Sequence, residues 1–162
     1  HNNAPITHVF TYDAAPAGWS ANLIGETTYP YDIFPAIPAV GDIVSFGSAT
    51  AYDNSGQFYT IVLDLDLGQT DLPNLTWSYS TGAGTWTTLT VCGNRSFDGT
   101  GVSIITFAPV ENWVAATYNA VAAFWIKCEL TVGVGAALGP RDLDDHAGLG
   151  ALRGREIVGD DR

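Results

Sequence analysis

Two cysteines and two asparagines are the residues of this chain best suited to covalent chemistry. Cys92 and Cys128 are the only cysteines among its 162 residues. An even pair permits a disulfide in an oxidising compartment, and the alternative is two buried thiols. Asn74 and Asn94 each begin an Asn-X-Ser/Thr motif near a predicted strand edge, where a glycan can be attached. The sequence therefore predicts one disulfide candidate and two glycosylation candidates, although such short motifs also arise by chance.

Histidine offers one candidate for metal chemistry. A β-sandwich with His1 at its start resembles the outline of lytic polysaccharide copper monooxygenases, in which the N-terminal amine and ring bind copper with a second histidine. His8 lies on a predicted strand, which would carry it about 20 Å from His1. His146 would have to fold back to reach His1, and no sequence motif indicates that it does. We favour the alternative, in which His1 simply follows a cleavage, and predict no copper site.

Aspartates offer a second metal candidate. Asp64, Asp66 and Asp71 could supply oxygen ligands to calcium, but no spaced loop motif accompanies them. Asp64 and Asp66 also alternate with leucines, as the solvent face of a half-buried strand does. No serine or cysteine stands in a recognisable motif with a histidine and an orienting group. The prediction is no catalytic residue, no metal and no cofactor.

Two of the five tryptophans are candidates for ligand binding. Trp19 lies in a proline-rich stretch, and Trp125 alternates against the predicted inward face of its strand. Exposed aromatic rings stack on sugars and also anchor neighbouring protein subunits. For Trp19 and Trp125, a sugar and a neighbouring protein subunit both stay open as the binding partner.

Charge restricts the partners further. The formal net charge is −11, with 6 basic and 17 acidic residues, so the chain repels phosphate backbones and nucleic-acid binding is excluded. No apolar run reaches the roughly 18 residues that a membrane-spanning helix needs. The polar, charge-poor body suits an extracellular or particle-bound protein.

Short alternating segments bounded by Gly, Pro, Asn and Asp indicate an all-β fold. The predicted strands are 6–13, 42–47, 57–66, 75–80, 85–92, 102–107 and 122–132. The turn at 81–84 predicts that 75–92 forms one antiparallel hairpin. Seven or more short strands favour an antiparallel β-sandwich of jelly-roll type over a barrel.

The chain divides into three predicted parts. Residues 1–40 would form an extended N-terminal strand and a proline-rich loop that packs on the sandwich. Residues 41–132 would form the β-sandwich core. Residues 133–162 would be a glycine-rich linker and charged tail outside the sandwich.

A family resemblance covers 41–132. The matching residues are 41–48, 59–66, 75–79, 84–89, Phe97, 101–102, 104–107, Pro109, Asn112, Trp113 and 123–127. Together they resemble a jelly-roll-like β-sandwich module of phage and viral tail, baseplate, fibre and particle-surface proteins. The chain departs from that pattern at 92–94 and at Cys128, which suggests a local cross-link or a separate branch of the family.

The resemblance implies a non-enzymatic structural protein that self-assembles into, or decorates, a virion surface or extracellular filament. Its partners would be copies of itself or other surface proteins, held by arms that add a strand to a neighbour's sheet. The alternative function is a carbohydrate-binding or adhesion module. A copper monooxygenase built on His1 is the third and least favoured function.

Overall fold

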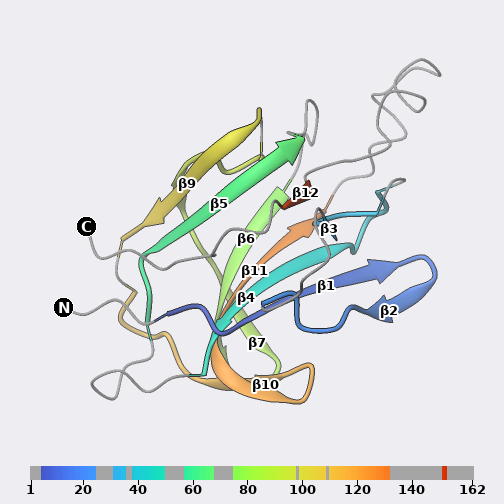
Figure 1. Ribbon diagram of the computed structural model, residues 1–162. Coiled ribbons are helices and arrows are strands. Elements are labelled where there is room, and N and C mark those ends of the chain that lie inside the picture. The colour runs from blue at the N-terminus through green and yellow to red at the C-terminus, as the bar shows by residue number, and fades with distance from the viewer. Residues whose placement is uncertain are drawn as a thin grey trace.

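The computed structural model describes residues 5–24, 31–35, 38–49, 57–67, 75–97, 99–108, 110–131 and 151–152. Within these ranges the regular structure is β-strand, and no helix long and apolar enough to cross a membrane is found there. The strands are β1 (His8–Ala14), β2 (Ala17–Trp19), β3 (Tyr31–Asp32), β4 (Ile43–Ser48), β5 (Thr60–Leu67), β6 (Leu75–Gly82), β7 (Thr85–Thr88), β8 (Val91–Gly93), β9 (Gly101–Phe107), β10 (Ala116–Tyr118), β11 (Val121–Leu130) and β12 (Ala151–Leu152) (Figure 1).

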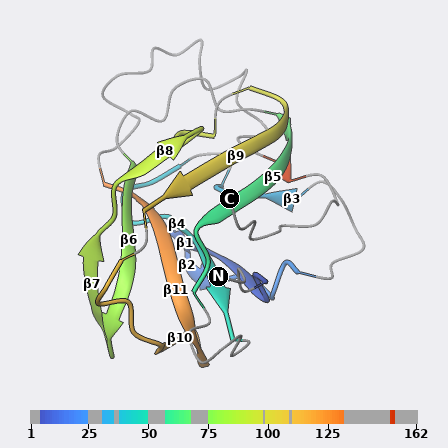
Figure 2. The same ribbon diagram turned by 90° about the vertical axis from the view of Figure 1, so that its left-hand side faces the viewer.

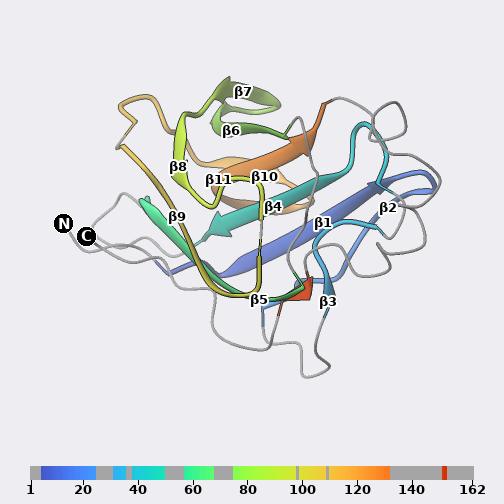
Figure 3. The same ribbon diagram turned by 90° about the horizontal axis from the view of Figure 1, so that it is seen from above.

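The strands form two antiparallel sheets. The first sheet has the order β2-β1-β4-β11-β6-β7, with β10 paired to the start of β11. The second has the order β3-β12-β5-β9-β8. Figure 2 shows β8, β9 and β5 as a layer separate from β6 and β11. Figure 3 shows β1, β4 and β11 side by side within the first sheet. The predicted all-β antiparallel sandwich is confirmed, while its jelly-roll connectivity stays a prediction.

The main core lies between the two sheets. It takes alternate residues from the long strands of both sheets, as the period-two pattern predicts. The fully buried large side chains include Phe46 from the first sheet and Ile61, Leu63 and Ile105 from the second. Alternation over 122–132 predicts one inward face, made of Phe124, Ile126, Cys128, Leu130 and Val132. Ile126, Cys128 and Leu130 are fully buried and Phe124 is partly buried, while Val132 lies outside the described residues. This core holds the first sheet in place and leaves its other face pointing away from the second sheet.

The predicted hairpin over 75–92 is correct only in its first part. β6 and β7 pair across a turn in which Gly82 and Gly84 have positive φ. The chain then leaves the first sheet, and β8 pairs with β9 in the second. Leu89 lies at the crossing, where its N–H donates to the Trp77 carbonyl and its side chain enters the core. A segment of uniformly strand-like composition therefore supplies two strands that belong to different sheets.

The predicted flanking segments also contribute strands. Within 14–40, β2 pairs with β1 and β3 pairs with β12. The expectation that the whole tail lies outside the sandwich is wrong for Ala151–Leu152, because β12 pairs with β5 on one side and β3 on the other. Two residues of the tail are thus part of the second sheet.

Candidate functional site

The outer face of the first sheet, turned away from the main core, carries a second group of aromatic side chains. We call the group the aromatic face. Its members are His8, Phe10 and Tyr12 of β1, Trp19 of β2, Trp86 of β7, Tyr118 of β10 and Trp125 of β11. Ring centroids of neighbouring members are 4.9–6.4 Å apart, within the range of favourable aromatic contacts. Strands from both edges and the centre of the sheet therefore meet in one cluster.

Small residues on β4 make room for this cluster. Ser45 and Gly47 face the aromatic side of the sheet, opposite Lys127 and Trp125 of β11. A Cβ on Gly47 would collide with the six-membered ring of Trp125. The Ser45 hydroxyl instead donates to the Phe10 carbonyl at 3.2 Å. The Trp125 ring can consequently lie flat against the backbone of its neighbouring strand.

Trp125 is the buried base of the aromatic face. The sequence placed it on the solvent side of its strand as a ligand-binding candidate, and it is fully buried. Its Nε1 donates to the carbonyls of Ala116 and Val121 at 3.1 and 3.2 Å, so its polar atom is also occupied. The alternation is correct, but the second face of the sheet is covered by Phe10 and Tyr118. Trp125 therefore supports the other rings and is not itself available to a ligand.

Hydrogen bonds hold Tyr118 over the sheet through the segment that leads into β10. The Ser80 hydroxyl donates to the Val114 carbonyl at 2.7 Å, and the Val114 N–H donates to the Ser80 carbonyl at 3.0 Å. The Trp113 indole donates to the Trp125 carbonyl at 3.1 Å. A two-residue turn then reverses the chain into β11, with positive φ at both central residues as a type I′ hairpin requires. These contacts fix the place of β10.

Trp19 is the most exposed ring of the aromatic face, with 38% of its surface accessible. It lies on β2, the edge strand of the first sheet, and its ring is 4.9 Å from both the Tyr12 and the Tyr118 ring. The proline-rich stretch therefore brings Trp19 to the rim of the same cluster whose base is Trp125. The structure thus brings both predicted tryptophans together, one exposed and one buried.

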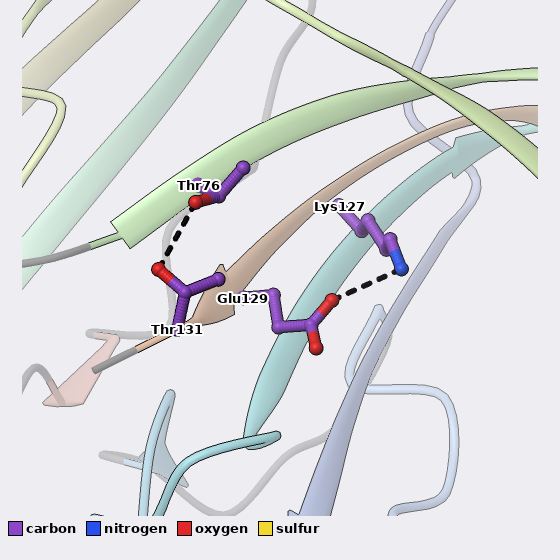
Figure 4. A network of polar contacts seen from close by, with 4 residues as sticks. All are labelled: Thr76, Lys127, Glu129 and Thr131. Atoms are coloured by element: carbon purple, nitrogen blue, oxygen red, sulfur yellow. Dashed lines mark hydrogen bonds and ion pairs between the residues drawn. The ribbon is translucent and has the colours of Figure 1, made fainter. Parts of the chain in front are cut away.

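Trp86 and a charged pair lie at the other side of the cluster. The Lys127 ammonium is 4.6 Å from the centre of the Trp86 ring, and it also donates to Glu129 Oε2 at 3.1 Å. Both side chains are partly buried. Figure 4 shows this pair beside the hydrogen-bonded hydroxyls of Thr76 and Thr131, which are 3.1 Å apart. Donors and acceptors therefore adjoin the aromatic rings.

The Tyr118 hydroxyl is buried without a hydrogen-bond partner among the described residues. Burial raises the pKa of Tyr118, and the nearby Glu129 and Tyr12 raise it further. Burial also lowers the pKa of His8, whose Nδ1 is hydrogen-bonded to Thr7 Oγ1 at 2.9 Å. The neutral forms of both side chains are therefore favoured within the aromatic face.

A buried carboxylate secures the end of β1. Asp42 is fully buried, and its two oxygens accept hydrogen bonds from the N–H groups of Ala14 at 2.8 Å and Ala39 at 2.6 Å. Its backbone N–H and C=O are bonded to Ala39 and Leu130. Asp42 thereby ties the β1–β2 hairpin, which carries Trp19, to β4 and β11.

The two cysteines are not joined. Cys92 is an exposed free thiol on β8, and Cys128 is a buried free thiol on β11. The two strands belong to different sheets. Burial raises the pKa of Cys128 well above its usual value, and Glu129 adds to the shift, so this thiol stays protonated. The structure therefore has neither the disulfide nor the two buried thiols that the sequence analysis considered: one thiol is exposed and the other is buried.

The other predicted candidates do not meet in one site. Asn94 is half-buried in the turn after β8, while Asn74 lies outside the described residues, as do His1, His146 and Asp71. Asp64 is half-buried on β5. Among the described residues, no three side chains of His, Cys, Asp or Glu gather as a metal site would require.

Sequence reasoning missed four members of the aromatic face: Phe10, Tyr12, Trp86 and Tyr118. Tyr12 alternates with Phe10 on β1, and Trp86 stands between threonines on a short strand, so both carried a periodic signal. For Tyr118 the only local signal in the sequence was Asn119, a residue type that favours the turn that follows. Their meeting depends on pairing between strands that are far apart in the chain.

Comparisons with protein-family models, curated proteins and solved structures found no match to this chain.

Proposed function

We propose that this chain is a non-enzymatic structural protein that self-assembles into, or decorates, a virion surface or an extracellular filament. The observation that supports the proposal is the position of β12. Its two residues pair with Leu65 and Leu67 of β5 and with Tyr31 and Asp32 of β3. The tail thus supplies the strand that joins β3 to the rest of the second sheet.

Such a strand can come from the same chain or from a neighbouring copy. Its pairing uses backbone hydrogen bonds, which every copy of the tail offers equally. Nineteen residues, 132–150, separate the last described residue after β11 from β12. A fully extended segment of that length spans about 60 Å, several times the separation of two packed sheets, which is about 10 Å. The tail is therefore long enough for exchange between adjacent copies.

Exchange of a tail strand turns a contact within one chain into a link between two. Each copy then donates one strand and accepts another, and a head-to-tail arrangement that does not close on itself grows into a filament or lattice. The resemblance of 41–132 to modules of phage and viral structural proteins is the reason for proposing a virion surface. Many weak links of this kind stabilise an assembly without a tight pairwise interface.

Cysteine pairing between two different chains tests the exchange. In a Cys92→Ser background, one chain carries Leu67→Cys and a second carries Ala151→Cys, at positions that lie opposite each other across β5 and β12. Mild oxidation of the mixture is expected to give a covalent dimer that contains one chain of each kind. A matched control replaces Leu67→Cys with Val102→Cys, an exposed position on β9 that does not pair with β12.

The native mass gives the companion measurement. Light scattering and negative-stain imaging of the full chain are expected to show assemblies that are lost when residues 133–162 are removed. A monomer near 17 kDa, together with a disulfide only in a chain that carries both cysteine substitutions, would show that the tail stays on its own sandwich and would overturn the proposal.

A further inference from the structure

The aromatic face extends across the first sheet from one edge strand to the other. Trp19 of β2 and Trp86 of β7 both contact the ring of Tyr118, at centroid distances of 4.9 and 5.0 Å. Their planes are inclined to that ring by 89° and 73°. We propose that the aromatic face binds an uncharged oligosaccharide. The second sheet, which holds β12, contributes nothing to this face, so the inference is independent of the proposed assembly.

Aromatic rings of this kind match the apolar surface of a sugar. One face of a pyranose ring presents C–H groups, which make favourable contacts with the electron-rich face of an indole or phenol. Trp19 is 38% exposed, and Tyr12, Trp86 and Tyr118 are half-buried, so these four rings are the accessible part of the cluster. Several rings along one face provide contacts for more than one sugar unit.

Polar groups beside the rings match the hydroxyls of the same ligand. Lys127 can donate and Glu129 can accept further hydrogen bonds, because each is only partly buried and each has polar hydrogens or lone pairs beyond their mutual contact. Adjacent sugar hydroxyls both donate and accept. Figure 4 shows that the hydroxyls of Thr76 and Thr131 continue this polar edge along β6 and β11.

The charges near the aromatic face favour an uncharged ligand. Lys127 is the one cation that contacts the rings among the described residues, and Glu129 neutralises it. The chain as a whole has a net charge of −11. An acidic glycan would therefore meet a repulsive field with no free cation within the cluster to compensate.

The exposed area is small for a protein partner. An exposed fraction of 38% of a tryptophan corresponds to about 100 Å², and the other accessible rings are less exposed. A stable protein interface needs about 800 Å² from each partner. A short oligosaccharide needs only a few rings, so it fits this surface better than a second copy of the chain.

The base of the cluster is built to keep these rings in place. The Trp125 ring is fixed by two hydrogen bonds of its Nε1 and by close packing on Gly47. It contacts Phe10 and Tyr118 at centroid distances of 5.8 and 5.4 Å. A surface that is ordered before binding loses less conformational entropy when a ligand arrives.

Titration with defined oligosaccharides tests the proposal. The full chain is titrated with uncharged hexasaccharides of glucose, mannose and N-acetylglucosamine, each up to about 10 mM, and with oligogalacturonate as the acidic comparison. Tryptophan fluorescence and calorimetry report binding. Trp19→Ala is the main variant because Trp19 is exposed, and Val102→Ala, 69% exposed on the opposite sheet, is its matched control. Circular dichroism confirms that both variants are folded.

The expected result is saturable binding of at least one uncharged hexasaccharide that Trp19→Ala weakens by about tenfold or more and Val102→Ala leaves unchanged. A second variant, Trp86→Ala, is expected to weaken binding in the same way. Three results would overturn the proposal: no uncharged hexasaccharide binds, only oligogalacturonate binds, or binding persists in both tryptophan variants. A change in native mass caused by Trp19→Ala, without any sugar binding, would identify a protein neighbour as the occupant instead.

Discussion

The Trp125 ring lies directly over Gly47 of the adjacent strand, and no Cβ fits between the ring and that backbone. The contact places the largest buried side chain of the outer cluster at the centre of the first sheet. It joins β4 to β11 by packing in addition to their backbone hydrogen bonds. The rings of His8, Phe10 and Tyr118 pack directly on the Trp125 ring.

Substitution of Gly47 is expected to be costly for this reason. Gly47→Ala forces either the Trp125 ring or β4 to move, and we expect the free energy of unfolding to fall by about 2 kcal/mol. Gly18→Ala is the matched control, because a Cβ there would have only the Pro16 carbonyl oxygen nearby, at 3.9 Å. Urea denaturation of the three proteins measures the difference. Equal stability of the two variants would contradict the packing described for Gly47.

Removal of the Asp42 carboxylate is expected to loosen the β1–β2 hairpin. Asp42→Ala leaves the N–H groups of Ala14 and Ala39 without their acceptors, and we expect a loss of about 3 kcal/mol. Asp13→Ala is a suitable control, because Asp13 accepts a single hydrogen bond, from the Ala15 N–H, at an exposed site. Thermal unfolding of both variants gives the comparison. A larger effect at Asp13 would refute the role assigned to Asp42.

The stability of the protein is expected to fall above pH 10 because of Tyr118. Burial raises the pKa of Tyr118 in the folded state, whereas an unfolded tyrosine ionises near pH 10. Above pH 10 the unfolded state therefore binds fewer protons than the folded state, and the free energy of unfolding decreases as the pH rises. Unfolding measured at pH 9 and pH 11 should show this loss in the wild type and a smaller one in Tyr118→Phe.

The same variant is expected to be as stable as the wild type at neutral pH, or more stable by up to about 1 kcal/mol. The Tyr118 hydroxyl is buried without a partner among the described residues, so its removal relieves a desolvation cost. A large loss of stability in Tyr118→Phe at pH 7 would mean that the hydroxyl is bonded in solution.

The two thiols are expected to differ sharply in reactivity. Cys92 is exposed and should react with a thiol reagent in the native protein. Cys128 is buried with a raised pKa and should react only after unfolding. A colorimetric thiol assay without and with denaturant is expected to count one and then two thiols. A count of zero in both conditions would restore the disulfide prediction.

Alternation along the chain predicted the sheets because it reports directly which side chains share a face. On β11 it identified Ile126, Cys128 and Leu130 as core residues, and all three are fully buried. It could not show whether the opposite face is also covered. The cover over Trp125 comes from Phe10 of β1, far away in the chain, and from Tyr118 of β10, the hairpin partner of β11.

The sequence pattern did not predict the break between β7 and β8, for a related reason. Residues 85–92 keep a strand-like composition throughout, and both Leu89 and Val91 enter the core. A strand that crosses between sheets has the same local preferences as one that continues. Only the pairing of β8 with β9 reveals the crossing.

The central place of β11 has a consequence for protein synthesis. β11 pairs with β4 on one side and with β6 on the other, yet among the described residues it is the last long strand in chain order. As the chain leaves the ribosome, β1 and β4 can pair with each other, and β6 can pair with β7, but among the described strands no backbone pairing connects these two pieces until β11 emerges. The backbone pairing of the first sheet is therefore completed only after translation has passed Leu130. Until then β4 and β6 each have an unpaired edge, at which the nascent chain can aggregate.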